Sequence, residues 1–386
     1  MVRQRAVLFA LIVVAACSAL MSSAPGPERF TSSVPNKAQA FIVNGQAAQR
    51  PVPFYVSIES VFDDNHSFIM GGGVLIGPRI VLTASHVVEL FLTKLNVRRP
   101  RLNTPYGTLV YPEAVLRVGR YLMKNDNAPY SYALAAIMHP SYTSADVLKA
   151  ADDEFRIAPF VTHDLAVILL DAPIKISTYA KLPPKGDLST EPAVRPGTKL
   201  RAIGFGDTQS LLKLRPRILQ ETDQFVGGAP DVCTDATKRL ECTRAIRVLK
   251  QYNVILTSRE VVGMKSSPLR SGMCKGDSGG PLYDPRTNIV WGIASISDAA
   301  CEGLLTLWAP PSAHRRFIDS AIDFLLTNAN TWTPVIRQDN QRRYAFQQKG
   351  NAICGFTPGE AGCRGIITDP SEFCGRQAFP GNALPK

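Results

Sequence analysis

The sequence has no apolar run of about 18 residues or more, which is what a helix needs to cross a bilayer, so a multi-spanning membrane protein is excluded. It also has no block of five or more lysines and arginines, so its net charge of +11 does not by itself indicate nucleic-acid binding. Its eight cysteines in 386 residues are too few for a disulfide-dense miniature scaffold. Apolar residues make up 45 % of the chain, which is enough for a large core and excludes a disordered protein.

Residues 1–24 are typical of an export signal. Arg3 and Arg5 precede an apolar stretch at 6–16 that is too short to span a bilayer. The small residues at 22–24 fit a signal-peptidase cleavage site. The sequence therefore predicts that the chain leaves the cytosol.

The signal contains a second pattern, because residues 14–17 (Val-Ala-Ala-Cys) fit a bacterial lipobox. Processing there would acylate Cys17, and the lipid would tether the protein to a membrane without spanning it. Free secretion and lipoprotein processing both remain open. Either route predicts an exported protein (of bacterial type if the lipobox is used) in a compartment that permits disulfides.

The rest of the chain divides by composition. Residues 25–41 are rich in Ser, Pro, Gly and Ala, which predicts an exposed linker or propeptide. Residues 42–326 hold the expected folded domain, and 327–386 form a polar C-terminal extension. The three cysteines of the extension lack the spacing and nearby histidines of zinc ligands, so their pairing stays open; they are Cys354, Cys363 and Cys374.

Short runs of β-branched and aromatic residues recur between turn signals within the folded domain. Many short strands and few helical periods predict an all-β sandwich or barrel. One amphipathic helix is predicted at 312–326. The strand-like runs are 54–58, 73–76, 79–82, 165–170, 200–203 and 289–294, and the expected apolar face of the helix is Phe317, Ile318, Ile322, Leu325 and Leu326.

The glycine-rich segment 276–281 (Gly-Asp-Ser-Gly-Gly-Pro) places Ser278 in a turn of the kind that exposes a nucleophile. It also contains Gly-x-Ser-x-Gly, the nucleophile elbow of α/β-hydrolases, after which a helix should begin. Residues 281–285 contain two prolines and do not favour a helix. An esterase or lipase on another fold is therefore the weaker alternative.

A serine hydroxyl needs an oriented base to become a nucleophile, so the five histidines are the next candidates. His86 ends an apolar run at 81–86, where a base can be packed and still be reachable. Asp164 stands at the head of another apolar strand, where a buried carboxylate can hold an imidazolium. Three of the others lie in polar or loop contexts and are expected at the surface: His66, His139 and His314.

Together, these motifs resemble those of the chymotrypsin-fold (trypsin-like, S1) serine proteases. Four segments match in order, and Gly-Phe-Gly at 204–206 resembles a fifth; the four are 42–45 (Ile-Val-Asn-Gly), 83–86 (Thr-Ala-Ser-His), 164–167 (Asp-Leu-Ala-Val) and 276–281. The order His, Asp, Ser differs from the Ser, Asp, His order of α/β-hydrolases. The resemblance covers about 42–326. It implies an all-β fold of two packed six-stranded antiparallel β-barrels with a C-terminal helix.

The resemblance also implies roles for individual residues. Ser278 would be the nucleophile, His86 the general base and then acid, and Asp164 the residue that orients His86. The backbone N–H groups of Gly276 and Ser278 would form the oxyanion hole. Asp277 would form an ion pair with the amine of Ile42 once the chain is cut before that residue.

Three positions match the family's substrate site. Ser295 aligns with the strand that holds the substrate backbone, Ser297 with the pocket wall, and Gly272 with the pocket floor. Because Gly272 carries no acidic group, no preference for Arg or Lys is expected. Phe41 precedes Ile42, so activation by another protease is expected instead of tryptic self-activation.

The cysteines and the loop lengths depart from the family pattern. Gly71 and Val87 stand where the disulfide beside the catalytic histidine would be, and Leu200 and Asp284 replace a second pair. The long gaps between the triad positions predict surface insertions at 91–135 and about 207–260. The resemblance implies a bridge between Cys274 and Cys301, and our own proposal is a second bridge between Cys233 and Cys242.

The function predicted from the sequence is a secreted serine endopeptidase that cleaves polypeptides through an acyl-enzyme on Ser278. No metal or organic cofactor is required, because histidine transfers the protons and backbone amides stabilise the charge. Nucleic acid is not an expected partner, and membrane contact is expected only through a lipid on Cys17. The alternative is a catalytically silent binding module with the same fold.

Overall fold

The computed structural model describes the central part of the chain, and in it no helix is both long and apolar enough to cross a membrane. Several predictions concern residues outside the described ranges. These are the export signal, Ile42, Cys233, Gly272, Cys301 and the three cysteines of the C-terminal extension. The described ranges are 46–63, 66–93, 101–112, 114–123, 127–144, 154–186, 191, 194–207, 215–227, 239–258, 273–297, 306–337 and 343–348.

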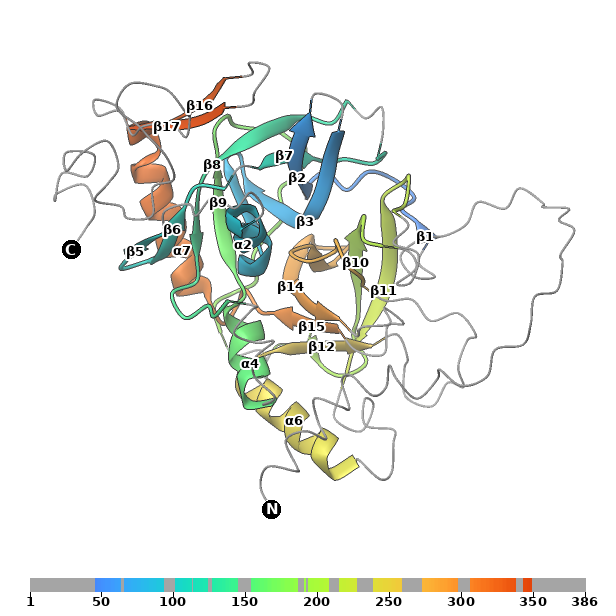
Figure 1. The fold of residues 1–386 in the computed structure, drawn as a ribbon. Coiled ribbons are helices and arrows are strands. Elements are labelled where there is room, and N and C mark those ends of the chain that lie inside the picture. Colours follow the sequence, from blue (N-terminus) through green and yellow to red (C-terminus); the bar gives the residue numbers. More distant parts are fainter. Residues whose placement is uncertain are drawn as a thin grey trace, which may run out of the picture.

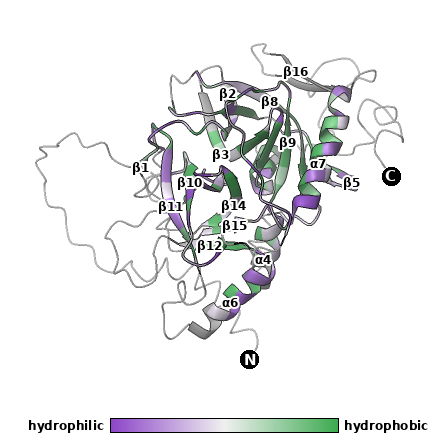
Figure 2. Ribbon diagram, turned by 180° about the vertical axis from the view of Figure 1, so that it is seen from behind, coloured by the Kyte–Doolittle hydropathy of each residue, from purple (hydrophilic) through white to green (hydrophobic). Residues whose placement is uncertain are grey.

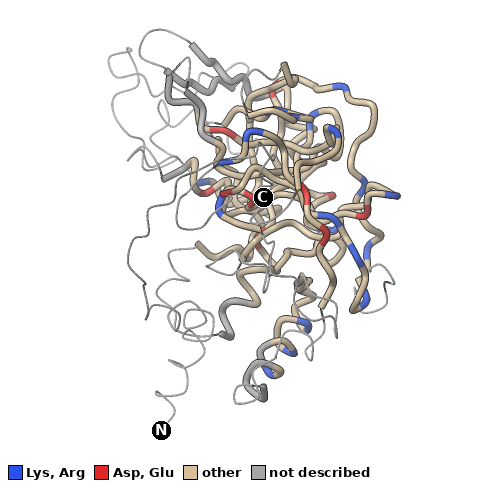
Figure 3. Tube along the Cα trace, turned by 90° about the vertical axis from the view of Figure 1, so that its right-hand side faces the viewer, with Lys and Arg blue, Asp and Glu red and all other residues tan. Residues whose placement is uncertain are grey.

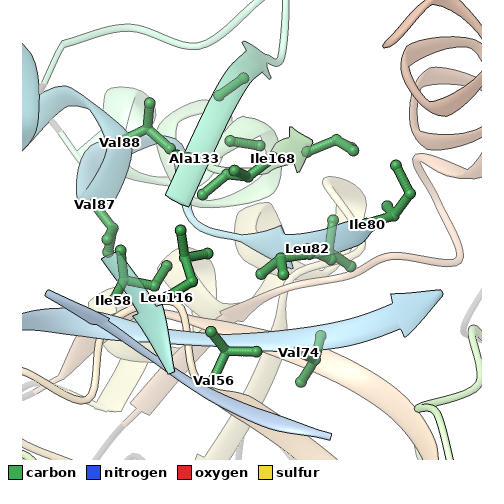
Figure 4. Packing of buried hydrophobic residues seen from close by; sticks show 14 of the residues in the cluster. Val56, Ile58, Val74, Ile80, Leu82, Val87, Val88, Leu116, Ala133 and Ile168 are labelled. Carbon is green, nitrogen blue, oxygen red and sulfur yellow. The ribbon is translucent and has the colours of Figure 1, made fainter. Parts of the chain in front are cut away.

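Six antiparallel strands close the first β-barrel (Figure 1). Its closure leaves these strands without free edges, and Figure 4 shows the aliphatic side chains packed together in its interior. β5 (Leu102–Thr104) and β6 (Gly107–Val110) continue the sheet outward from β8 (Tyr130–Met138). The strands of the ring are, in order, β2 (Tyr55–Asp63), β3 (His66–Gly77), β4 (Ile80–Thr83), β9 (Ala166–Leu170), β8 (Tyr130–Met138) and β7 (Val115–Val118), which returns to β2.

The second barrel repeats this closure with six more antiparallel strands. Its core contains Trp291 and Trp308, and β1 (Gln46–Ala47) pairs from outside with β11 (Gln220–Val226), a strand of the ring. Two six-stranded antiparallel barrels followed by a helix are the predicted fold, which is confirmed. The ring runs through β10 (Lys199–Gly204), β11 (Gln220–Val226), β12 (Ile255–Ser258), β15 (Thr306–Ala309), β14 (Ile289–Ser297) and β13 (Pro281–Asp284), which returns to β10.

The described residues form four α-helices around the barrels: α2 (Ser85–Thr93), α4 (Glu154–His163), α6 (Arg239–Gln251) and α7 (Arg315–Thr327). Hydrophobic residues gather on most strands, whereas α6 alternates hydrophilic and hydrophobic residues (Figure 2). Figure 3 shows basic residues along α6, and three of them are exposed: Arg244, Arg247 and Lys250. After α7, the short helix η3 (Ala329–Thr331) leads into a hairpin of β16 (Trp332–Arg337) and β17 (Arg343–Gln348).

The C-terminal helix is confirmed, but its expected apolar face is partly wrong. Ile318 and Leu325 are buried as predicted, together with Ala321 and Phe324. Leu326 is 45 % exposed. Helical geometry explains the difference, because residues 318, 321 and 325 lie along one stripe and residue 326 is turned a further 100° or so away from it.

The prediction that 91–135 and about 207–260 are surface insertions is wrong where these segments form strands of the barrels. The first segment contains β7 and part of β8, and the second contains β11 and β12, all of which belong to the barrel rings. β11 was hard to predict because all of its buried residues except Val226 are polar: Gln220, Glu221, Thr222 and Gln224. Hydrogen bonds and ion pairs compensate that burial, as from Thr257 Oγ1 to Gln224 Oε1 at 3.0 Å and between Arg201 and Glu221 at 3.2 Å.

Candidate active site

His86 lies where the first barrel ends a strand and begins a helix. β4 ends at Thr83 and α2 begins at Ser85, so His86 stands in the first turn of that helix. β4 pairs with β9, with Thr83 opposite Ala166, and this register brings the residue before β9 close to the start of α2. The Ser85 hydroxyl donates to the Leu165 carbonyl at 2.6 Å and ties the two segments together. Two apolar strands thus deliver a histidine and a carboxylate to one place.

Asp164 holds His86 by two hydrogen bonds. Its Oδ2 lies 2.6 Å from Nδ1 of His86, and its Oδ1 accepts the backbone N–H of His86 at 2.9 Å. The carboxylate is fully buried. The ring proton on Nδ1 therefore points at Asp164, and Nε2 keeps a lone pair that can accept a proton.

The charge of Asp164 also sets the acid–base behaviour of His86. Burial by itself lowers the pKa of the imidazole, but the Asp164 carboxylate and, more weakly, Glu89 act in the opposite direction. The net result is that the pKa of His86 is raised above its ordinary value. The protonated imidazolium is thus favoured by its surroundings, as general acid–base work by this residue requires.

Ser295 reaches the same carboxylate from the other barrel. It lies on β14, and its hydroxyl donates to Oδ2 of Asp164 at 2.7 Å. Sequence reasoning assigned Ser295 to the substrate strand and missed this contact, since nothing in the local pattern links residues 131 positions apart. The second barrel therefore helps to orient a carboxylate that belongs to the first.

The turn that carries Ser278 is fixed between the barrels. The backbone N–H of Gly72 in β3 donates to the Ser278 carbonyl at 2.7 Å. On the other side, the N–H of Gly279 donates to the carbonyl of Ala294 at 2.8 Å, next to Ser295. The turn thus contacts both strands that border His86 and Asp164, and the half-buried Ser278 lies at the same seam.

The missing disulfide beside His86 is accounted for by direct contact. A Cβ built on Gly71 would lie 2.8 Å from Cγ2 of Val87 and 2.7 Å from the Ser278 carbonyl oxygen. Residues 71 and 87 therefore face each other, as the two ends of the absent bridge should. The valine side chain fills that space and leaves no room for a side chain at position 71.

Asp277 is buried directly beside the candidate nucleophile. Its Oδ1 accepts the N–H of Gly206 at 2.7 Å and its Oδ2 accepts the N–H of Cys274 at 2.9 Å. A Cβ on Gly204 or Gly206 would lie within 2.3 Å of a carboxylate atom of Asp277, so the Gly-Phe-Gly segment is needed to admit the carboxylate.

No ion pair reaches Asp277 within the part of the chain that the structure describes, which excludes Ile42. Burial is the largest influence on its carboxyl group and raises its pKa to about 6, although the two backbone hydrogen bonds and the charge of Arg215 act against it. Since Ile42 is joined to Phe41 by a peptide bond in the intact chain, its amine carries no charge there.

The remaining predicted site residues are placed only in part. Gly276 is buried in the loop before Ser278 and has φ +98°, a backbone conformation that favours glycine. Ser297 ends β14. Cys274 is disulfide-bonded, but Cys301 lies outside the described residues, as do Cys233, Gly272 and Ile42, so both disulfide pairings stay predictions. Cys242 lies in α6, where only the backbone is described.

The expected surface position of the other histidines is wrong for His139. This residue is 8 % exposed and packs against His163, His314 and Phe317. His314 is half-buried, and its Nε2 lies 3.0 Å from the Thr162 hydroxyl. Local polarity misled the prediction, because chain segments far apart in the sequence cover these rings. Nothing is described of the His66 side chain.

Two closed antiparallel barrels with a histidine, a buried aspartate and a glycine-flanked serine at their seam define a protein of the chymotrypsin-like class. The family model described as Trypsin matches residues 42–309, more than half of the sequence. The chain belongs to the trypsin family.

Known relatives include proteases of animals. The chain is 26 % identical over 331 residues to the CLIP domain-containing serine protease B10 of Anopheles gambiae, covering 81 % of this chain and 75 % of that protein. It is 27 % identical over 242 residues to human granzyme M, covering 63 % and 73 %. A solved structure of a mutant of human heparin binding protein (CAP37) has 19 % identity and a TM-score of 0.49, covering 73 % of this chain and 97 % of that one.

Proposed function

We propose that this protein is an exported serine endopeptidase that hydrolyses peptide bonds through an acyl-enzyme on Ser278. The observation that carries the proposal is the pair of His86 and the fully buried Asp164, joined at 2.6 Å beside the turn of Ser278. A buried carboxylate that holds an imidazole in one tautomer has a clear use if a nucleophile lies on the other side of the ring.

The mechanism follows from this geometry. While its Nδ1–H donates a hydrogen bond to Asp164, His86 accepts the Ser278 hydroxyl proton at Nε2, and Oγ attacks the scissile carbonyl carbon. Asp164 stabilises the resulting imidazolium, which then protonates the leaving amine. A water molecule, deprotonated by the same Nε2, releases the acyl group. The backbone N–H groups of Gly276 and Ser278 would stabilise the oxyanion in both halves of the reaction.

The intact chain is proposed to be an inactive precursor. Asp277 is buried and its pKa is raised to about 6, so the ionised carboxylate is disfavoured until a cation joins it. Cleavage between Phe41 and Ile42 by another protease would supply the Ile42 ammonium. A permanently silent binding module would have no use for this arrangement, and it remains the alternative.

A fluorophosphonate probe, which phosphonylates only activated serines, tests the proposal. The processed protein should be labelled, and Ser278→Ala should abolish the labelling. Ser177→Ala, at an exposed position, is the matched control and should label like the parent. Failure of the processed, folded parent to react would favour the silent module.

The Ser295 hydroxyl should contribute to catalysis through Asp164 alone. Ser295→Ala removes the 2.7 Å hydrogen bond to Oδ2 and should lower kcat/KM by about tenfold, since a hydrogen bond to a charged group contributes about 1.5 kcal/mol. The test is steady-state kinetics with a peptide substrate. An unchanged kcat/KM would show that the other hydrogen bonds hold Asp164 without help from the second barrel.

The place of action is also a proposal. The pattern at 1–24 supports export, either as a free protein or with a lipid on Cys17, and the lipobox would make the export route bacterial in type. Polypeptides are the substrates that the family implies.

A further inference from the structure

Three histidines that the proposed mechanism does not use lie together away from Ser278. They are His139 after β8, His163 at the end of α4 and His314 just before α7. One ligand nitrogen from each can be chosen so that all three lie within 4.8 Å of one another. The rings of His139 and His163 are stacked with centroids 4.7 Å apart, and the ring of His314 meets that of His139 edge-on at 4.7 Å.

The fold holds these three residues firmly in place. The N–H of His139 donates to the Leu165 carbonyl at 2.9 Å, which fixes it to the segment that follows His163. Phe317, one turn into α7, packs against the His139 ring with centroids 4.7 Å apart. A strand end, a helix end and a helix start therefore converge, and their rings are preorganised.

His314 and His163 already present suitable ring nitrogens. The Thr162 hydroxyl donates to the Tyr252 carbonyl at 2.7 Å, so its oxygen accepts a hydrogen bond from Nε2–H of His314 at 3.0 Å. Nδ1 of His314 then carries a lone pair. Nδ1 of His163 is buried and has no hydrogen-bond partner in the described residues. Burial lowers the pKa of His163, and the Pro159 carbonyl, one helical turn earlier, acts in the opposite direction without reversing that shift. A neutral ring with its proton on Nδ1 keeps a lone pair on Nε2.

His139 is the residue that has to change on ligation. Its Nδ1 accepts a hydrogen bond from the N–H of Ser141 at 3.1 Å. Ligation through Nδ1 would use that lone pair, and ligation through Nε2 would place the ring proton on Nδ1, so either one ends the hydrogen bond. Metal binding requires neutral imidazoles. Burial lowers the pKa of His139 to about 3 and that of His314 to about 4, and it also lowers the pKa of His163.

We propose that His139, His163 and His314 form a binding site for one Zn²⁺ ion. A set of three imidazoles without carboxylates suits zinc and related transition metals and does not suit Ca²⁺ or Mg²⁺. Zn–N bonds of about 2.0–2.1 Å place tetrahedral ligands about 3.4 Å apart, so the cluster contracts slightly on binding, and water takes the fourth position. The ion would join α7 to the segment that carries Asp164.

Calorimetric titration with ZnCl₂ tests the site in the full chain carrying Ser278→Ala, which removes the proposed catalytic activity from every readout. One Zn²⁺ should bind per chain and should raise Tm, because the ion binds the folded state. His139→Gln and His314→Gln should each weaken binding at least about tenfold. His66→Gln, at the start of β3, is the matched control and should bind like the parent.

A second measurement covers the case in which a variant fails to fold. Diethyl pyrocarbonate modifies neutral histidines, and mass spectrometry identifies the modified peptides. Zinc should protect the peptides that contain His163 and His314 in the Ser278→Ala chain. The proposal is overturned if zinc produces neither heat nor protection, if protection falls on His86 alone, or if the folded His314→Gln variant binds like the parent. None of these outcomes bears on the labelling of Ser278.

Discussion

Asp164→Asn should lower kcat of the processed protein by about 10⁴, the loss that removal of this carboxylate causes in the serine protease triad. The fully buried Asp164 carboxylate accepts a hydrogen bond from Nδ1–H of His86 at an N···O distance of 2.6 Å. An asparagine can instead present its N–H₂ group to Nδ1, which moves the ring proton to Nε2. His86 would then have no lone pair to accept the proton of Ser278.

The same variant should change the pH dependence of what activity remains. General-base catalysis needs neutral His86, so activity falls as the pH drops through its pKa, which Asp164 helps to raise. Without that negative charge, the acid limb of kcat/KM should move to lower pH. Steady-state kinetics from pH 5 to 9 would measure both effects, with the exposed Asp323→Asn as control. A loss of less than tenfold with an unmoved acid limb would show that Asp164 does not orient the base.

Asp277→Asn should be the second large loss and should appear only after processing. In the processed protein, the variant would leave the Ile42 ammonium without a charged partner in a buried place. Removing one partner of a buried ion pair costs about 3–5 kcal/mol, so activity should fall about 10²- to 10⁴-fold. Mass spectrometry must first show that both chains begin at Ile42. A processed variant with parental activity would contradict the activation pair.

In the intact chain, where Ile42 has no free amine, the buried Asp277 should lower the stability of the fold as the pH rises. Its folded-state pKa of about 6 lies above the ordinary aspartate value, so the folded chain binds more protons than the unfolded chain between about pH 4 and 6. This group therefore costs about 3 kcal/mol of stability as the pH rises through that window. Urea unfolding of uncleaved Ser278→Ala chains should show this difference, which Asp277→Asn removes and Asp323→Asn keeps. Equal pH slopes in all three chains would contradict it.

Strands with a plain apolar pattern were predictable from the sequence. The runs at 54–58, 165–170 and 289–294 became β2, β9 and β14 because their side chains fill the barrel cores. β11 was missed because most of its buried residues are polar, and a partner such as Thr257, which donates to Gln224, comes from another strand. Local reading cannot detect such a strand, since its hydrogen-bond partners exist only in the assembled sheet.

The sequence by itself determined the residue types of the candidate site. The motifs around His86, Asp164 and Ser278 predict a base, an orienting acid and a nucleophile because serine chemistry needs that set, and their order differs from that of α/β-hydrolases. The short apolar runs likewise determined the all-β class of the fold.

Only the tertiary structure decided which distant residues meet. It brought Ser295 of the second barrel into contact with Asp164 and placed Val87 in the space of a missing disulfide. It also gathered three histidines, of which local polarity had assigned His139 and His314 to the surface. The physical reason is that burial and contact depend on barrel closure and helix packing. These bring together side chains more than a hundred positions apart, and no local pattern records that.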